Sequence, residues 1–554
     1  MSGFLSPPPE GGFGAGVRAG GKHSYQRFFR LTGDRTVRVS TSIRHGFIAL
    51  GVLAVGMIGC DPSKAIDRLA SEILPARSGM TVTAGLTEWQ VFQRNGNGFA
   101  TIACNGTSER DGDVWGRVLM RGKPLGGLGW HKVGEAETGR WSATIKFVPT
   151  GGPYSVDLRV GKEQVDACGV VVTNIVVGDI WILAGQSNMQ GRGRMVNVEP
   201  PSPLVRTYGM NEKWEQAVEP LHWLNESIDA VHYTSASKKE LAMARQSIRR
   251  KVGRGAGLGL PFAAALSSQT QVPIGLVPCA HGGTSIAQWD PAKRDEGGNS
   301  LYGSMYRRFK AVGGQVRGVL WYQGEAETRD GGKAASTYKA SLTRFIERVR
   351  EDFGDPELPF YQVQLGRTVN DRPVEAWCSV REDQRLVARE VPGVYTVAAV
   401  DLDLDDNIHI GTAGLKRLGR RLAKVADCAL FDNNYVTPGP RVKSVTLADA
   451  NWYDRVVKNA AVRVTFENIN GRLLPDCHIV GFSLRDADNK EIAPFFDVMV
   501  DPEQPDSVLC LLGKPIPDNA RLWYGYGLNP FCNLTDEEDM AVLAFGPMTI
   551  QRDD

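Results

Sequence analysis

The middle of the chain alternates short apolar runs with segments of helical periodicity. The runs IVVGDIWILAG, VPIGLVPCA, VRGVLWYQG, PFYQVQL and GVYTVAAVDLDL are separated by LGLPFAAALSSQ, YGSMYRRFKAVGG, TYKASLTRFIERVREDFG and LKRLGRRLAKVADCAL. In the third separating segment, Tyr338, Leu342 and Phe345 recur at four- and three-residue spacing, which predicts an amphipathic helix. Apolar strands that alternate with helices predict a parallel sheet, so we expect an α/β domain over residues 174–435.

On both sides of this domain the pattern changes to short alternating runs broken by Gly, Asn and Pro. TEWQVFQR, NGNGFATIACNG and GRWSATIKFVPTGGPYSVDLRV lie on the N-terminal side, and VKSVTLADA, AVRVTFENING, HIVGFSLRDADN, DSVLCLLG and ARLWYGYGL lie on the C-terminal side. Alternation with a period of two and frequent turns predict antiparallel strands. We therefore expect one β-sandwich domain over residues 81–173 and a second over residues 436–554.

The first 80 residues are organised differently. Arg44 and His45 precede the apolar run GFIALGVLAVGMIG, which ends on a glycine directly before Cys60. The run is short for a membrane span, which needs about 20 residues, but it fits the apolar region of an export signal. The order resembles a bacterial lipoprotein signal. We expect residues 1–60 to form a signal and membrane anchor with Cys60 lipidated, residues 61–80 to be a linker, and the protein to be exported to the cell surface or periplasm. A buried apolar helix with an incidental cysteine is the alternative.

Composition excludes some classes of function. With 64 basic and 62 acidic residues the formal net charge is +2, so the totals do not predict a basic face for nucleic acid. The nine cysteines form no CxxC pair and lack the Cys and His spacing of structural zinc sites, so neither a metal nor another cofactor is expected. Cys104 and Cys168 could pair in an exported protein, although spacing alone does not establish a disulfide.

The strongest chemical signal is the motif GQSNM at residues 185–189, directly after an apolar strand. Ligands of open α/β sheets bind at the carboxyl ends of strands, so Ser187 lies where a reaction would take place. The motif is not the GxSxG elbow, because position 189 is Met. We predict that Ser187 is a nucleophile; the alternative is a turn serine that caps a helix.

A second motif, DNIH at residues 406–409, lies between the last strand of the α/β domain and a helix. A serine nucleophile needs a base, and in a DxxH turn the Asp can hold the imidazole in the required tautomer. We therefore predict His409 as the base and Asp406 as its orienting acid, with Asp405 as the reserve candidate for the acid. The alternative is a solvated acidic loop with an incidental histidine.

Two strand ends between these motifs could supply the donors of an oxyanion hole. HGGTS follows the strand GLVPCA, and a glycine there offers an unobstructed backbone N–H; we prefer Gly283 to Gly282. WYQGE follows the strand VRGVL, and its Gln323 offers a neutral amide donor at the same sheet edge. A Gly-Gly turn and a structural amide that ties two loops together are the alternatives.

Other polar and aromatic residues near these motifs are candidates for substrate binding. Glu325 could bind a sugar hydroxyl, support His409 or fasten its own loop, and the last role is favoured. Aromatic faces can stack on pyranose rings in an open cleft, and core packing is the equally weighted alternative. The candidates are Asn188, Glu325, Trp289, His222, Trp223 and, as pocket lining, His281.

Five ordered blocks together resemble the SGNH hydrolase superfamily and, within it, the sialate O-acetylesterase family, which is close to the acetylxylan esterases of carbohydrate esterase family six. The blocks are VGDIWILAGQSNM, IGLVPCAHGGTSIAQW, GVLWYQGEAE, WCSVREDQ and DNIHIGTAGLKRLGRRLA. The resemblance extends outward to TEWQVFQR and RLWYGYGLNPFCNL, so it covers most of residues 81–548.

This resemblance implies a flavodoxin-like three-layer α/β/α catalytic domain flanked by two β-sandwich domains. It implies metal-independent release of acetate by Ser187, His409 and Asp406. It assigns the oxyanion hole to the N–H groups of Ser187 and Gly283 and the Gln323 side chain, where most SGNH enzymes use Asn.

The expected partner is an O-acetylated glycan, and three substrate classes stay open: sialic acid, xylan or another polysaccharide. A charged insert over about residues 200–254 departs from the family pattern and could shape the substrate mouth. A non-catalytic carbohydrate-binding surface protein is a rival, but it would not need these motifs intact. A lipase or thioesterase would need a deep apolar pocket, which the polar loops 191–197 and 325–333 do not predict.

Overall fold

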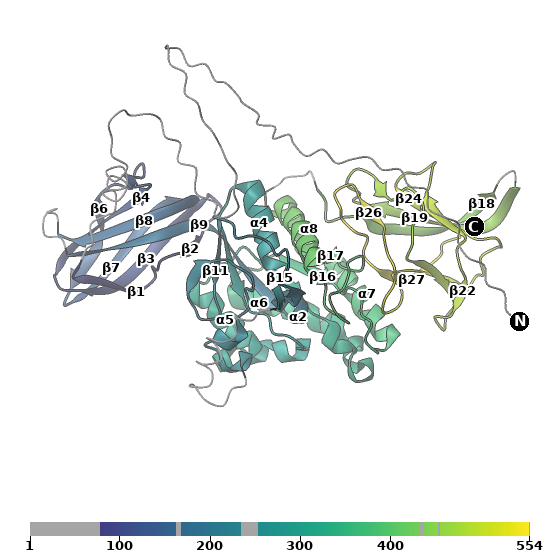
Figure 1. The fold of residues 1–554 in the computed structure, drawn as a ribbon, viewed down its shortest axis with the longest axis horizontal. Coiled ribbons are helices and arrows are strands. Elements are labelled where there is room, and N and C mark those ends of the chain that lie inside the picture. Colours follow the sequence, from purple (N-terminus) through teal and green to yellow (C-terminus); the bar gives the residue numbers. More distant parts are fainter. Residues whose placement is uncertain (1–77, 162–167, 234–252, 432–435, 453–454, 553–554) are drawn as a thin grey trace, which may run out of the picture. The chain divides into compact units, whose positions relative to one another are not determined.

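A parallel sheet forms the centre of the α/β part of the computed structural model (Figure 1). Most residues of its strands are buried, as expected for a sheet that is covered on both faces. In pairing order the parallel strands are β11 (Val205–Tyr208), β14 (Ile274–Pro278), β9 (Gly169–Gly185), β15 (Gly318–Tyr322), β16 (Phe360–Gln364) and β17 (Val394–Ala398). The mixed α/β architecture with a large central sheet is thus confirmed.

The structure describes residues 78–161, 168–233, 253–431, 436–452 and 455–552. The chain divides into two units, Met1–Asp67 and Arg68–Asp554, and all described residues belong to the second. The predicted signal and Cys60 lie outside the described residues, as does nearly all of the predicted linker. Among the helices that are described, none has the length and apolar character needed to span a bilayer.

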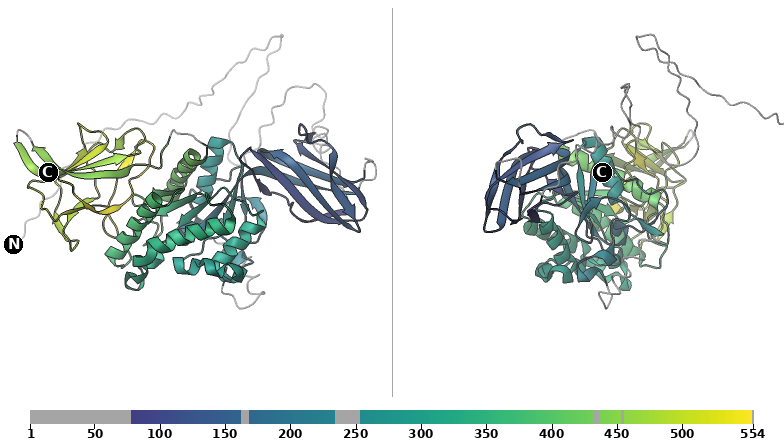
Figure 2. Two further views of the ribbon diagram at one scale, coloured as in Figure 1. Left: turned by 180° about the vertical axis from the view of Figure 1, so that it is seen from behind. Right: turned by 60° about the vertical axis from the view of Figure 1, so that its left-hand side comes forward.

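In the part of the chain that the structure describes, five helices of more than ten residues accompany the sheet and form two packed groups. One group pairs α4 with α8, and in the other α5 packs on α6 and α6 on α7 (Figures 1 and 2). The helices are α4 (Gly259–Thr270), α5 (Leu301–Ala311), α6 (Tyr338–Phe353), α7 (Val374–Glu390) and α8 (Thr412–Phe431). Four of them were predicted from apolar periodicity. α7 was not, because its buried face carries the polar side chains of Arg381 and Gln384 between apolar residues.

β9 connects the parallel sheet to the N-terminal strands without a break. Its first half pairs antiparallel with β8 (Gly151–Val160), and its second half pairs in parallel with β14 and β15. The predicted boundary between residues 173 and 174 therefore falls inside a single strand, and both regions share one 15-stranded sheet.

The N-terminal region consists of strands around one hydrophobic cluster. β3 and β7 alternate buried and exposed residues along most of their length, as the sequence pattern predicted. Cys104 and Cys168 are both buried and both free, so the disulfide considered above is not formed. The further strands, in pairing order toward β8, are β1 (Met80–Ala84), β3 (Phe99–Ser108), β7 (Arg140–Pro149), β6 (His131–Glu137) and β4 (Gly112–Met120).

The C-terminal region contains two four-stranded sheets whose side chains share one hydrophobic cluster that includes Val464, Leu484 and Leu522. The first sheet has the order β18 (Arg441–Trp452), β19 (Arg455–Glu467), β24 (Ser507–Leu511) and β23 (Asp497–Val500). The second has the order β22 (Glu491–Ala493), β21 (Phe482–Arg485), β25 (Arg521–Tyr524) and β27 (Phe545–Thr549).

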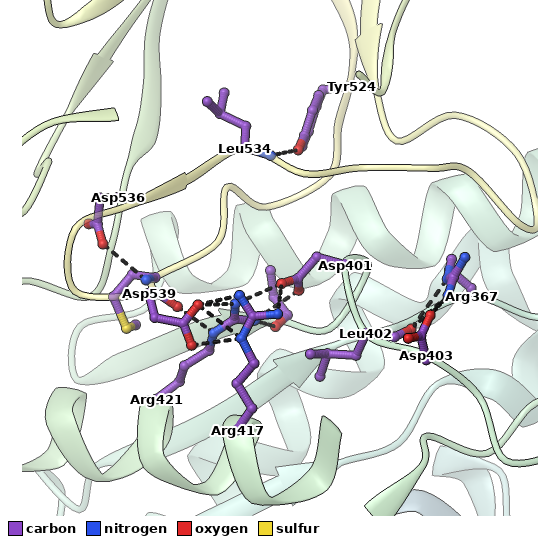
Figure 3. A network of polar contacts seen from close by, with 12 residues as sticks. Arg367, Asp401, Leu402, Asp403, Arg417, Arg421, Tyr524, Leu534, Asp536 and Asp539 are labelled. Carbon is purple, nitrogen blue, oxygen red and sulfur yellow. Dashed lines mark hydrogen bonds and ion pairs between the residues drawn. The ribbon is translucent and has the colours of Figure 1, made fainter. Parts of the chain in front are cut away.

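An ion-pair network joins α8 to this C-terminal region (Figure 3). The side chain of Arg421 is 1% exposed; it pairs with Asp401 at 2.7 Å and donates to the backbone oxygen of Asp539 at 2.5 Å. Arg417 pairs with the carboxylates of the same two residues. A buried guanidinium needs such partners to offset its desolvation. Since Asp401 begins the loop that carries the DNIH motif, the network anchors the start of that loop.

Candidate active site

Ser187 begins the short helix α2 (Ser187–Gln190) directly after the carboxyl end of β9 (Figure 1). The backbone turns at Gly185, where φ is +131° and a Cβ atom would lie 2.2 Å from the carbonyl oxygen of Tyr322 on β15. Only glycine permits this close approach of two neighbouring strands. The turn leaves Ser187 partly exposed at the edge of the sheet.

The structure brings Ser187, His409 and Asp406 into one hydrogen-bonded chain. The Nε2 atom of His409 lies 2.9 Å from Ser187 Oγ, and its Nδ1 atom lies 2.9 and 3.0 Å from the two carboxylate oxygens of Asp406. With the proton on Nδ1 held by the carboxylate, Nε2 is free to accept from the hydroxyl. This is the arrangement that the two motifs predicted.

Asp406 is held as an anion by several donors. Although partial burial favours the neutral acid, hydrogen bonds from the His409 ring and from the backbone N–H groups of Ile408 and His409 keep the pKa of Asp406 well below its usual range. Arg254, the first residue of β13 (Arg254–Ala256), adds a contact of 2.5 Å from Nη1 to the carboxylate. Sequence reasoning missed Arg254, because nothing in the charged insert that it ends distinguishes it from its neighbours.

Asp405, the reserve candidate for the acid, has a different partner. Its carboxylate accepts from the backbone N–H of Arg194 at 2.8 Å, while its own N–H donates to the carbonyl oxygen of His409. Its side chain therefore shapes the loop and leaves the imidazole to Asp406.

The glycine loop after β14 lies against the serine. A Cβ atom on Gly282 would be 3.4 Å from Ser187 Cβ. The N–H of Gly282 is already engaged, since it donates to Gln190 Oε1 at 2.9 Å. The N–H groups of Gly283 and Ser187 have no acceptor in the described part of the chain. The geometry thus agrees with the choice of Gly283 over Gly282 as the available donor.

Gln323 differs from the prediction. Its side chain is fully buried, and Nε2 donates to Glu327 Oε2 at 2.5 Å and to the carbonyl oxygen of Thr284 at 3.2 Å. Both amide hydrogens are therefore occupied, and Gln323 ties two loops together as in the structural alternative. The carboxylate that holds it, Glu327, was not singled out, although it lies in the same block, two residues after Glu325.

Asn188 and Glu325 form a buried pair behind Ser187. Asn188 Nδ2 donates to Glu325 Oε1 at 2.8 Å, and Asn188 Oδ1 accepts from the backbone N–H of Ile410 at 3.1 Å. Desolvation raises the pKa of Glu325 to about 7, even though the Asn188 contact favours the anion. The two residues are only 2% and 3% exposed, and their side chains hydrogen-bond to each other inside the protein. The structure does not support the predicted substrate contact of Asn188, whereas for Glu325 the contacts agree with the favoured role of fastening its loop. The pair connects the segment after β15 to the loop that carries His409.

The predicted aromatic cleft is also corrected. Trp289 is completely buried, its ring packs edge-on against Trp321 at 5.4 Å, and its Nε1 donates to Thr284 Oγ1. His222 is buried as well, whereas Trp223 is half-buried. Core packing therefore accounts for Trp289 and His222. Among the described residues, no group of three or more His, Cys, Asp or Glu is placed to hold a metal ion.

Comparison with known proteins agrees with the five sequence blocks. Residues 177–428 match the family described as carbohydrate esterase, sialic acid-specific acetylesterase. A protein of Arabidopsis thaliana named probable carbohydrate esterase is 33% identical over 270 residues, which are 44% of this chain and 88% of the relative. Human sialate O-acetylesterase is 23% identical over 303 residues, which are 48% of this chain and 56% of the relative.

The fold has a counterpart among solved structures. A carbohydrate acetylesterase from Xanthomonas citri has a TM-score of 0.57 at 21% identity, over 84% of this chain and 99% of that chain. At this identity the likeness concerns the fold. Together with the match to the Arabidopsis thaliana relative over most of that protein's length, these findings place the present chain in the carbohydrate esterase, sialic acid-specific acetylesterase family.

Proposed function

We propose that the protein hydrolyses acetyl esters on sugars through a covalent acetyl-enzyme on Ser187. The observation that carries the proposal is the continuous chain from Asp406 through His409 to Ser187 Oγ, with contacts of 2.9 Å on each side of the imidazole. A hydroxyl becomes a nucleophile when a positioned base accepts its proton, and a carboxylate stabilises the imidazolium that results.

In the first half of the reaction Ser187 Oγ attacks the acetyl carbonyl carbon while its proton passes to His409 Nε2. The negative oxygen of the tetrahedral intermediate accepts from the N–H groups of Ser187 and Gly283. The intermediate then breaks its bond to the sugar oxygen, which takes the proton from His409. The products of this step are the sugar with a free hydroxyl and acetyl-Ser187.

In the second half a water molecule attacks the acetyl-enzyme. His409 accepts one proton from the water and returns it to Ser187 Oγ when the second tetrahedral intermediate collapses. Acetate leaves, and the free serine is regenerated. Hydrolysis of one ester by one water molecule is therefore balanced without any further reactant.

For the substrate we propose an O-acetylated glycan. The family description and the name of the human relative favour acetylated sialic acid as the first to test. Acetylated xylan or another acetylated polysaccharide is the second, because the charged insert predicted over about residues 200–254 departs from the family pattern and could shape the substrate mouth.

We propose further that residues 81–173 and 436–554 are β-sandwich domains that flank the esterase domain, and that the protein is exported and anchored through Cys60. In each region, strands that pack around a shared hydrophobic cluster support the first proposal. The apolar run before Cys60 supports the second. Metabolic labelling with palmitate should mark the full chain and fail to mark a Cys60→Ala variant.

The central test is acetate release by the full-length protein from acetylated sialic acid and acetylated xylan. Ser187→Ala should lower kcat by about 10⁴-fold or more, the scale of nucleophile removal in serine hydrolases. Ser336→Ala, at an exposed serine of the same domain, is the matched control and should keep the wild-type rate. Acetate release that is equal in wild type and Ser187→Ala would refute the mechanism. The absence of release from both glycans would favour a carbohydrate-binding protein.

A further inference from the structure

A second hydrogen-bond chain built on histidine lies beside the glycine loop. His281 directly precedes Gly282, where an added Cβ atom would lie 3.4 Å from Ser187 Cβ, and the N–H of His281 donates to the carbonyl oxygen of Gly185 at 3.0 Å. The ring of His281 is only half-buried. His281 therefore belongs to the rim of the same sheet edge as Ser187, although the base that contacts Ser187 Oγ is His409.

The chain runs inward from His281 to a carboxylate. The Nδ1 atoms of His281 and His232 are 3.2 Å apart, and the two rings stack at 5.4 Å. His232 Nε2 lies 3.1 Å from Ser304 Oγ on α5, and Ser304 Oγ donates to Asp229 at 2.7 Å. Arg307 closes the chain with two hydrogen bonds of 2.8 Å to the Asp229 carboxylate.

The position of each proton in this hydrogen-bond chain follows from the carboxylate at its inner end. Although partial burial favours the neutral acid, the hydrogen bonds from Arg307 and Ser304 keep the pKa of Asp229 below its usual range, so this carboxylate only accepts. Ser304 has a single hydroxyl hydrogen and gives it to Asp229. Ser304 Oγ must then accept from His232, which places a proton on His232 Nε2.

The two imidazoles extend this pattern of donors and acceptors to the surface. Burial lowers the pKa of His232 to about 3 and also lowers the pKa of His281, so each ring carries one proton at neutral pH. With its proton on Nε2, His232 has a lone pair on Nδ1 and accepts from Nδ1–H of His281. The remaining nitrogen, His281 Nε2, is consequently a lone pair without a proton.

This nitrogen is open. His281 Nε2 has no hydrogen-bond partner in the described part of the chain. The atom is also not one of the buried atoms without a partner, so it is accessible to solvent. A fixed acceptor on the residue before the glycine loop, presented by a neutral ring, fits a hydroxyl donor. The hydroxyl-rich face of a sugar supplies such donors next to each ester position.

We propose that His281 Nε2 accepts a hydrogen bond from a free sugar hydroxyl adjacent to the carbon that carries the acetyl group. His281 is thus a residue that determines specificity, and Ser304 and His232 are positioning residues that set its tautomer. The inference rests on the proposed function, since it assigns part of the substrate to that site.

The test uses the full-length protein and a series of acetylated methyl xylopyranosides with a single acetyl group. In the series each hydroxyl next to the ester is replaced in turn by hydrogen, or by fluorine, which can accept but not donate. The wild type should lose about 10-fold in kcat/KM when the recognised hydroxyl is removed, the scale of one hydrogen bond at a partly exposed site. The fluoro and deoxy analogues should lose equally, because the protein group is an acceptor.

In His281→Ala the ratio of kcat/KM between the hydroxyl-bearing sugar and its deoxy analogue should fall close to one. Ser304→Ala, a small change inside α5, should lower the same ratio because the tautomer is no longer fixed. His131→Ala on β6 is the matched control: it removes a half-buried histidine far from this chain in sequence and should keep the wild-type ratio. The ratio cancels any general loss of folded enzyme.

Equal ratios in wild type and His281→Ala would overturn the proposal, and so would a wild type that tolerates fluorine but not hydrogen, because the protein group would then be a donor. If His281→Ala fails to fold, Ser304→Ala decides: an unchanged ratio overturns the tautomer argument. Failure of the proposed function is distinguishable, since Ser187→Ala would then release acetate as fast as the wild type.

Discussion

Two hydrogen-bonded series of Asp, His and Ser side chains end at neighbouring strands, one at Ser187 after β9 and the other at His281 after β14, but the order of their groups differs. In the first, Asp406 contacts the imidazole of His409, which contacts Ser187. In the second, Ser304 stands between the carboxylate of Asp229 and the imidazole of His232. Each carboxylate is in turn held by an arginine, Arg254 for the first and Arg307 for the second.

The order of the groups decides what each imidazole can do. A carboxylate in direct contact stabilises the cation that forms when His409 takes a proton, so this ring can act as a base. His232 is buried without such a contact, and its pKa falls to about 3. His232 stays neutral and fixes which nitrogen of His281 carries the proton. Residue type alone therefore does not distinguish a catalytic histidine from a positioning one.

The largest expected effect distinguishes the roles of the Asp406 and Asp229 carboxylates. Asp406→Asn should lower kcat by about 10⁴-fold, because the amide favours the wrong tautomer of His409 and cannot stabilise its cation. Asp229→Asn should lower the rate on a simple acetyl ester by less than about 10-fold, since two side chains separate it from His281. Steady-state kinetics of both variants, with thermal unfolding to verify folding, makes the comparison. Equal losses in the two folded variants would remove the distinction between the chains.

The second prediction applies the same rule to Glu325, a carboxyl that contacts an amide instead of a cation. Its folded-state pKa of about 7 lies above the usual 4.5, so the stability that it contributes is complete below pH 4.5 and is lost as pH rises through 7. The wild type should lose about 3 kcal/mol relative to Glu325→Gln between pH 4 and pH 7. Urea unfolding of both proteins at the two pH values measures this difference. Parallel pH profiles would show that Glu325 is ionised in the folded protein.

The third prediction concerns the buried imidazole. Because the pKa of His232 falls from 6.5 to about 3 on folding, its stabilising contribution is present above pH 6.5 and is lost as pH falls toward 3. At pH 5 the wild type should have lost about 2 kcal/mol more than His232→Gln, relative to their stabilities at pH 8. Denaturant unfolding at both pH values tests it, with His131→Gln as the control. A variant with the wild-type acid sensitivity would mean that His232 is protonated in place.

The smallest expected effect is at the arginine that holds the catalytic carboxylate. Arg254→Ala should lower kcat by about 10-fold, because Asp406 loses one charge-assisted donor but keeps the three contacts from its own turn. Arg254→Lys should recover part of the rate. Arg194→Ala, which removes the guanidinium beside Asp405, is the matched control and should have little effect. If Arg254→Ala lowered kcat as much as Asp406→Asn does, the arginine would have to be counted as part of the catalytic chain.

The predictions from sequence succeeded where the relevant contacts are local. Apolar runs and periodicity located the parallel strands and four of the five long helices that the structure describes, and the short spacing within DNIH placed Asp406 against His409. The position of GQSNM after a strand located Ser187 at the sheet edge. In each case the geometry follows from backbone hydrogen bonds and residues a few positions apart, which a sequence pattern records directly.

Contacts between distant segments were decided only by the tertiary structure. Trp289 and Gln323 have the residue types of a binding site, yet packing against Trp321 and hydrogen bonds to Glu327 and Thr284 withdraw them into the core. Arg254 reaches Asp406 across 152 positions in the chain, and His232 reaches Ser304 across 72. Chemistry at a sheet edge depends on burial and on which charge touches which group. These depend on the whole packed arrangement of strand ends, whereas the motifs record only the residues that each strand end carries.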